Sequence, residues 1–206
     1  MRLALRHTRL LFALALLAPS AGAQRASSEP GSQLTANFDG ASARTIQQLV
    51  DSLAATGVPS QILIDKAVEG ARKGAPPERV LSVIRSYAGH IRTAQTILGS
   101  GMRNDVYQAA ANALLAGVSV RVLHDLHALR PPPKLVLPLV VVTDLTLRGV
   151  PEDSAAVYVT RLLAADARDS DLAELQQSVA QGIIAGTRPA VAASSAAQQT
   201  LRRLNP

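Results

Sequence analysis

Two histidines three residues apart are the clearest candidates for metal chemistry in this sequence. His124 and His127 occur in the run VLHDLHAL, and residues three apart on a helix lie on one face. Two imidazoles on one face could hold a metal ion, so His124 and His127 are the predicted ligands. The set is incomplete, because zinc sites use three or four protein ligands and the chain has no cysteine. The alternative is that both histidines lie on a helix surface or in a groove.

Two glutamates are the candidates for a catalytic carboxylate. Glu69 has Lys66 three residues before it and Lys73 four residues after it, a spacing that favours a solvated ion-pair face. Glu78 lies beyond the next glycine–proline cluster. The chain contains no G-x-S-x-G motif, Walker loop or G-x-G-x-x-G motif that would accompany hydrolysis or nucleotide chemistry. An enzyme is therefore the less favoured interpretation, and no cofactor is predicted.

The first 23 residues have the pattern of a secretory signal peptide. Three arginines precede the apolar run from Leu10 to Leu17, and residues 21–23 form a small-x-small cleavage site. The apolar run is too short to cross a bilayer, which takes about 20 residues. We therefore expect a mature chain that begins at Gln24, has no stable membrane span, and is periplasmic or extracellular. A retained N-terminal anchor is the alternative.

Charge and composition narrow both the function and the fold. Loss of residues 1–23 removes three arginines and no acid, which lowers the formal net charge from +6 to +3. This ordinary charge and the predicted export argue against a nucleic-acid partner. The chain has no tryptophan, two phenylalanines and three tyrosines, whereas sheet folds are enriched in aromatic residues. Alanine, leucine, valine and isoleucine suffice to pack helices, so we expect an all-α fold.

The polar, unpatterned residues 24–41 predict a flexible tether, and residues 42–206 a single helical domain. Short joints divide that domain: residues 57–59 and 149–151 both read GVP, and residues 74–77 read GAPP. A glycine just past a helix adopts the left-handed conformation without strain, and a proline suits the first turn of the next helix. Joints this short predict consecutive helices that turn back on one another.

Apolar spacing between the joints predicts about eight or nine antiparallel helices, in an α-hairpin stack or an irregular bundle. They are expected at about 42–56, 59–73, 77–98, 104–116, 119–130, 132–148, 151–165, 169–185 and 189–204.

The run LVLPLVVV at residues 135–142 is open to two interpretations. Its β-branched residues suit a strand, but Pro138 would remove a hydrogen bond from a central strand. A buried helix is favoured.

The segment from Gly57 to Val80 resembles one found in exported bacterial proteins of unknown function. The similar elements are G-V-P and K-A-x-E-G-x-x-K-G-x-P-x-E-R-V. The resemblance implies helical architecture and export, and it assigns no functional residue.

These observations favour an exported, non-catalytic interaction or scaffolding protein of the cell envelope, whose partner is an unknown envelope protein. The alternative is a periplasmic protein that binds a small ligand or metal in a groove near His90, His124 and His127.

Overall fold

The computed structural model describes residues 30–59 and 61–205, and within them all regular structure is helical, with ten α-helices, one 3-10 helix and no strand. The expected all-α fold is confirmed, with a helix count close to the prediction. The predicted signal peptide lies outside the described residues. The helices are α1 (Pro30–Asn37), α2 (Gly40–Ala54), α3 (Gln61–Arg72), α4 (Pro77–Leu98), α5 (Asn104–Leu115), α6 (Val120–Leu129), η1 (Pro132–Lys134), α7 (Val136–Leu147), α8 (Glu152–Ala164), α9 (Asp169–Ile184) and α10 (Pro189–Leu204).

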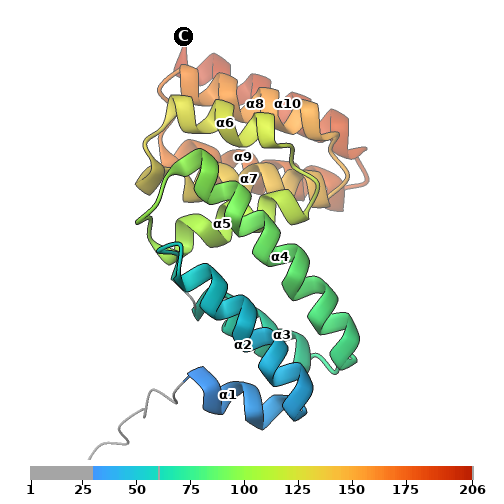
Figure 1. Ribbon diagram of the computed structural model, residues 1–206. Helices are drawn as coiled ribbons and strands as arrows, with labels where there is room; N and C mark the ends of the chain where they lie inside the picture. Colours follow the sequence, from blue (N-terminus) through green and yellow to red (C-terminus); the bar gives the residue numbers. More distant parts are fainter. Residues whose placement is uncertain (1–29, 60, 206) are drawn as a thin grey trace, which may run out of the picture.

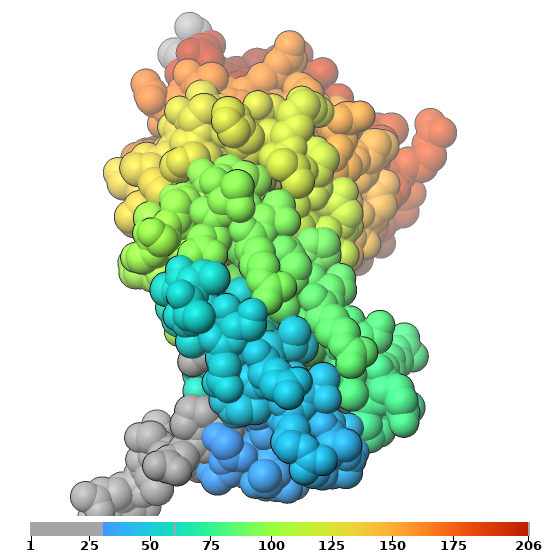
Figure 2. Space-filling view, viewed as in Figure 1, coloured from blue at the N-terminus to red at the C-terminus, as the bar shows by residue number. Residues whose placement is uncertain are grey.

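The helices form a bundle of two layers (Figure 1). One layer consists of the even-numbered helices, in which α2 contacts α4, α4 contacts α6, α6 contacts α8 and α8 contacts α10. In the other layer α1 contacts α3, and α5, α7 and α9 lie side by side. Antiparallel pairs such as α4–α5 and α9–α10 join the layers. In the space-filling view, α1–α3 form a narrower part below the broader block of α5–α10 (Figure 2).

The N-terminal region differs from the expected tether. Residues 30–37 form α1, which packs against α2 and α3 and buries Leu34. The N-cap of α2 is Asp39, whose Oδ1 accepts the amide N–H groups of Ala41 and Ser42, both at 2.9 Å. The prediction of a tether was therefore wrong for residues 30–41. The polar composition of this segment gave no sign that Leu34 is buried or that Asp39 caps α2.

The glycine joints close the helices as expected. Gly117 has φ +94°, its amide donates to the Leu114 carbonyl at 3.1 Å, and the Val118 amide donates to the Ala113 carbonyl at 2.9 Å. This pair of bonds satisfies carbonyls that the helix end leaves free. The same pattern recurs at other joints, around Gly57, Gly74, Gly149 and Gly186. The valines that follow Gly57, Gly117 and Gly149 are buried in the corners between helices.

Residues 132–147 are helical rather than extended, in agreement with the favoured interpretation. The 3-10 turn η1 leads into α7, and Pro138 lies in its first turn, where the missing N–H leaves no intrahelical bond unmade. Helix α7 is apolar on most sides because α5, α6, α8 and α9 all pack against it. One face of α4 forms a buried apolar stripe, made of Val80, Ile84, Tyr87, Ile91, Ala94 and Leu98.

Small residues let the last two helices approach closely. A Cβ added at Gly182 would lie 3.0 Å from the Cβ of Ala192, which is closer than side chains normally pack. The facing side of α10 is built from alanines, including Ala193, Ala196 and Ala197. The closeness of α9 and α10 thus depends on the absence of side-chain volume at residue 182.

A buried carboxylate connects the same two helices. Asp171 in the first turn of α9 accepts the Arg168 amide N–H at 2.8 Å and pairs with Arg203 of α10 at 3.2 Å. Its pKa is held below the ordinary value of 3.8, chiefly by the Arg168 N–H and then by the charges of Arg168 and Arg203, against the opposing effect of burial.

Gly182→Leu should lower the free energy of unfolding by about 1–3 kcal/mol, because the new side chain must push α10 away. Gly89→Leu is the matched control, since Gly89 is also inside a helix but has no atom within 4 Å of an added Cβ. Chemical denaturation of both variants checks this. Equal stability of the two variants would contradict the close packing of α9 and α10.

Asp171→Asn should destabilise the protein at pH 7, and this loss should shrink as the pH falls below the ordinary carboxyl pKa of 3.8. A carboxylate whose pKa is lowered by folding contributes stability above its unfolded pKa and loses that contribution as the pH falls through its folded pKa. Melting curves from pH 7 to pH 2.5 measure the difference from wild type. Asp169→Asn, in the same first turn but exposed, is the control and should show a smaller difference. A wild-type advantage over Asp171→Asn that does not shrink in acid would be inconsistent with this role.

Candidate functional site

A groove lies between α5 and α7 in the odd-numbered layer, and α3 and α9 each add one residue to its lining. Its volume is about 500 Å³, and it is open to solvent. We call it the α5–α7 groove. Its lining residues are Lys66 from α3, Ala109, Asn112, Leu115 and Ala116 from α5 and its C-terminal end, Val140, Thr143, Asp144 and Leu147 from α7, and Gln176 from α9. Its lining residues recur every three or four positions along α5 and along α7, so the groove follows the seam between these two helices.

Large apolar side chains are exposed along this groove. Leu147 is 71% exposed, and Leu115 and Val140 are each 41% exposed. Leu115 and Leu147 are the last residues of α5 and α7, two positions before Gly117 and Gly149. Each leucine therefore lies at a helix end that turns away at the joint. Exposed apolar side chains gathered in one hollow are typical of an interaction site.

Three amide side chains lie beside this apolar surface. Gln108 and Asn112 are one turn apart on α5, and Gln176 lies on α9. Within the described part of the chain, none of these amides has a side-chain hydrogen bond to another group. Each amide offers two N–H donors and an acceptor oxygen, so the groove combines apolar contact with free hydrogen-bonding capacity.

A smaller hollow of about 210 Å³ adjoins the groove, and both are lined by Lys66 and Asn112. Tyr87 of α4 and Gln108 also line this hollow. The Lys66 ammonium lies 5.8 Å from the centre of the Tyr87 ring, which permits a cation–π contact, and 2.9 Å from Glu69 Oε2. Lys66 is therefore held between α3 and α4, with its ammonium directed to the hollow.

Neighbouring groups shift the pKa values of Glu69 and Tyr87 in this hollow. Ion pairs with Lys73 and Lys66 lower the pKa of Glu69. Burial, together with the nearby Glu69 carboxylate, raises the pKa of Tyr87 to about 12. At neutral pH Glu69 is thus a carboxylate, and the Tyr87 hydroxyl keeps its proton. A lowered pKa makes Glu69 a weak base, which does not favour general acid–base catalysis. Glu78 is exposed in the first turn of α4.

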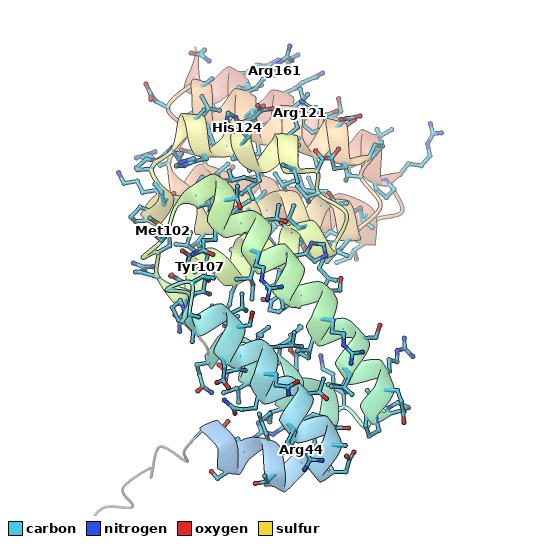
Figure 3. All side chains as sticks on the ribbon, in the orientation of Figure 1. Arg44, Met102, Tyr107, Arg121, His124 and Arg161 are labelled. Carbon is cyan, nitrogen blue, oxygen red and sulfur yellow. The ribbon has the colours of Figure 1, made fainter. Side chains whose placement is uncertain are left out.

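The predicted metal ligands lie in the other layer, on α6. His124 is exposed, and Figure 3 shows it near Arg121 and far from Arg44 of α2. His127 is half-buried, and its Nδ1 atom is buried with no hydrogen-bond partner among the described residues. His90 is on α4, where its Nε2 lies 3.4 Å from the Ser86 hydroxyl. In the described ranges, no three His, Cys, Asp or Glu side chains are grouped so that they could hold a metal ion. The histidine pair stays a prediction.

The sequence interpretation missed the groove itself. Among its lining residues, the sequence predicted an ion pair for Lys66 and a buried helix around Val140, but no site. One sequence signal was present: an apolar residue two positions before a joint glycine, in LAG at 115–117, LRG at 147–149 and IAG at 184–186. Ile184 is 84% exposed, so the same position is apolar and exposed at three successive joints.

No helix in the described ranges has both the length and the apolar character required to cross a bilayer. In comparisons with known proteins, no family model, no curated protein and no solved structure matches the chain.

Proposed function

We propose that the chain is an exported, non-catalytic interaction or scaffolding protein of the cell envelope, and that a partner envelope protein binds in the α5–α7 groove. The observation that carries this proposal is the gathering of Leu115, Val140 and Leu147 in one open groove. Side chains of this size are costly to expose, and binding a partner would remove them from water.

Export rests on the sequence. The proposed signal peptide would direct the chain out of the cytoplasm, and the mature protein would begin at Gln24. The resemblance of residues 57–80 to exported proteins supports the same location. The location in turn restricts the partner to proteins of the periplasm, the cell surface or the surroundings, and it disfavours a nucleic acid.

A proposed repeat of helix pairs also supports the scaffold role. The joint glycines after α3, α5, α7 and α9 are Gly74, Gly117, Gly149 and Gly186, and all have positive φ. They separate α4–α5, α6–α7 and α8–α9, which we propose are successive units of unequal length. Stacked helix pairs present extended surfaces to partners, and their function requires no catalytic residue.

The proposal predicts that the groove captures a partner in intact cells. Tagged protein carrying its own leader is crosslinked, purified and examined by mass spectrometry, which also shows whether the mature chain begins at Gln24. Leu115→Gln should reduce the stoichiometry of the captured partner several-fold, because it removes apolar contact from the groove.

Leu129→Gln is the matched control. Leu129 is the last residue of α6 and is 42% exposed, against 41% for Leu115 at the end of α5. It should retain the partner. Equal losses in both variants, or no stoichiometric partner for folded and exported wild type, would refute the proposed function.

A further inference from the structure

We infer that the smaller hollow beside the α5–α7 groove binds one small, uncharged molecule rich in hydroxyl groups, a monosaccharide or polyol. This hollow of about 210 Å³ lies where α3, α4 and α5 meet, and we call it the Tyr87 hollow. The inference goes beyond the proposed function, because the ligand is a small molecule and the site does not use the exposed apolar side chains of the groove. Three observations carry it: a buried hydroxyl without a partner, a balance of charges, and a mixture of donors and acceptors.

The Tyr87 hydroxyl is a polar group that the packing of the protein leaves without a hydrogen bond. Tyr87 belongs to the buried stripe of α4 and is only 2% exposed, yet no group among the described residues bonds to its hydroxyl. The hydroxyl is not sealed in, because His127 Nδ1 is the buried polar atom without a partner in the described ranges, and Tyr87 lines the hollow. Burying a hydroxyl without a partner costs free energy, which phenylalanine would avoid. A ligand in the hollow would provide the missing partner.

The charges around the hollow cancel. Asp65 and Glu69 contribute carboxylates to its lining, and Lys66 contributes an ammonium. Lys73, just past the end of α3, also pairs with Glu69, so two negative groups are accompanied by two positive ones. A ligand carboxylate would lie beside Asp65 and Glu69, and a ligand ammonium would lie beside Lys66, so either ion would meet repulsion. An uncharged ligand avoids both costs.

The hollow offers hydrogen-bond donors and acceptors together. The Tyr87 hydroxyl can donate, since burial and the Glu69 carboxylate raise its pKa to about 12. Lys66 has N–H groups beyond the one that it donates to Glu69 Oε2 at 2.9 Å. Asp65 accepts from Gln61 at Oδ1, and its other oxygen can accept from a ligand. A hydroxyl group both donates and accepts, so neighbouring hydroxyls of one molecule match this mixture.

The size of the hollow suits a single small molecule. Its volume of about 210 Å³ equals that of about seven water molecules in the liquid, at ~30 Å³ each. This volume is close to that of one sugar ring, and it is too small for a folded partner. Gln108 is half-buried and lines the hollow from α5, so a bound ring would be contacted from three helices.

Saturation-transfer NMR on the purified protein tests this inference, with glucose, galactose, myo-inositol and glycerol as the hydroxylated probes. Acetate and ethylammonium are the charged comparisons. Small ligands gain limited free energy per atom, so a Kd on the order of 1 mM is expected for the tightest hydroxylated probe. Tyr87→Phe should weaken the binding of that probe roughly 2–10-fold, because it removes one hydrogen bond and keeps the ring.

Tyr107→Phe is the matched control. Tyr107 is also buried, but its hydroxyl donates to the Gly99 carbonyl at 2.7 Å and does not line the hollow. This variant should keep the wild-type Kd and lower the melting temperature, whereas Tyr87→Phe should not lower the melting temperature, because no bond within the protein is lost.

Leu115→Gln separates this inference from the proposed function. Leu115 lines the α5–α7 groove and not the Tyr87 hollow, so Leu115→Gln should keep the wild-type Kd for the probe. If the probe binds as described but cells yield no partner, the proposed function falls and the inference stands.

Three results would overturn the inference. The first is no binding of any hydroxylated probe at about ten times the expected Kd. The second is an equal Kd for wild type and Tyr87→Phe, which would place the probe outside the hollow. The third is tighter binding of acetate or ethylammonium than of every hydroxylated probe, which would show that the hollow takes an ion.

Discussion

The structure depends on how its helices end. At each joint glycine, φ is positive and two backbone N–H groups return to carbonyls of the last turn. These bonds pair the last carbonyl groups of each helix within a short joint. The buried valine that follows Gly117 or Gly149 packs in the corner between the two helices. Because the joints are so short, α5, α7 and α9 must lie side by side, and the α5–α7 groove is a consequence of that alignment.

The α5–α7 groove brings exposed apolar side chains and polar side chains together. Leu147 is 71% exposed, more than any other leucine or valine among the described residues, and Leu115 and Val140 are exposed beside it. The carboxamides of Asn112 and Gln176 likewise lack the pairing that Asp171 and Asp39 have. Exposed apolar and unpaired polar groups in one place are features that packing alone does not require. They are accounted for if a partner covers them.

The fold could be predicted from the sequence because its signals are local. Steps of three and four residues predicted α4, and the Gly-Val-Pro runs predicted the joints. The prediction failed where the local pattern was weak: Leu34 is buried and Asp39 caps α2, but no apolar periodicity surrounds them. The groove could not be predicted in full, since Lys66, Asn112 and Gln176 are far apart in sequence and meet only through the layering of four helices.

The central claim is that the odd-numbered layer is the binding face, and site-specific crosslinking tests it most directly. The chain has no cysteine, so a single introduced cysteine gives one defined position in it for a photo-crosslinker. Val140 of α7 and Val157 of α8 are 41% and 47% exposed, and they lie in different layers. In intact cells, Val140→Cys should crosslink to the partner while Val157→Cys does not. A partner that crosslinks at residue 157 and not at residue 140 would contradict the account.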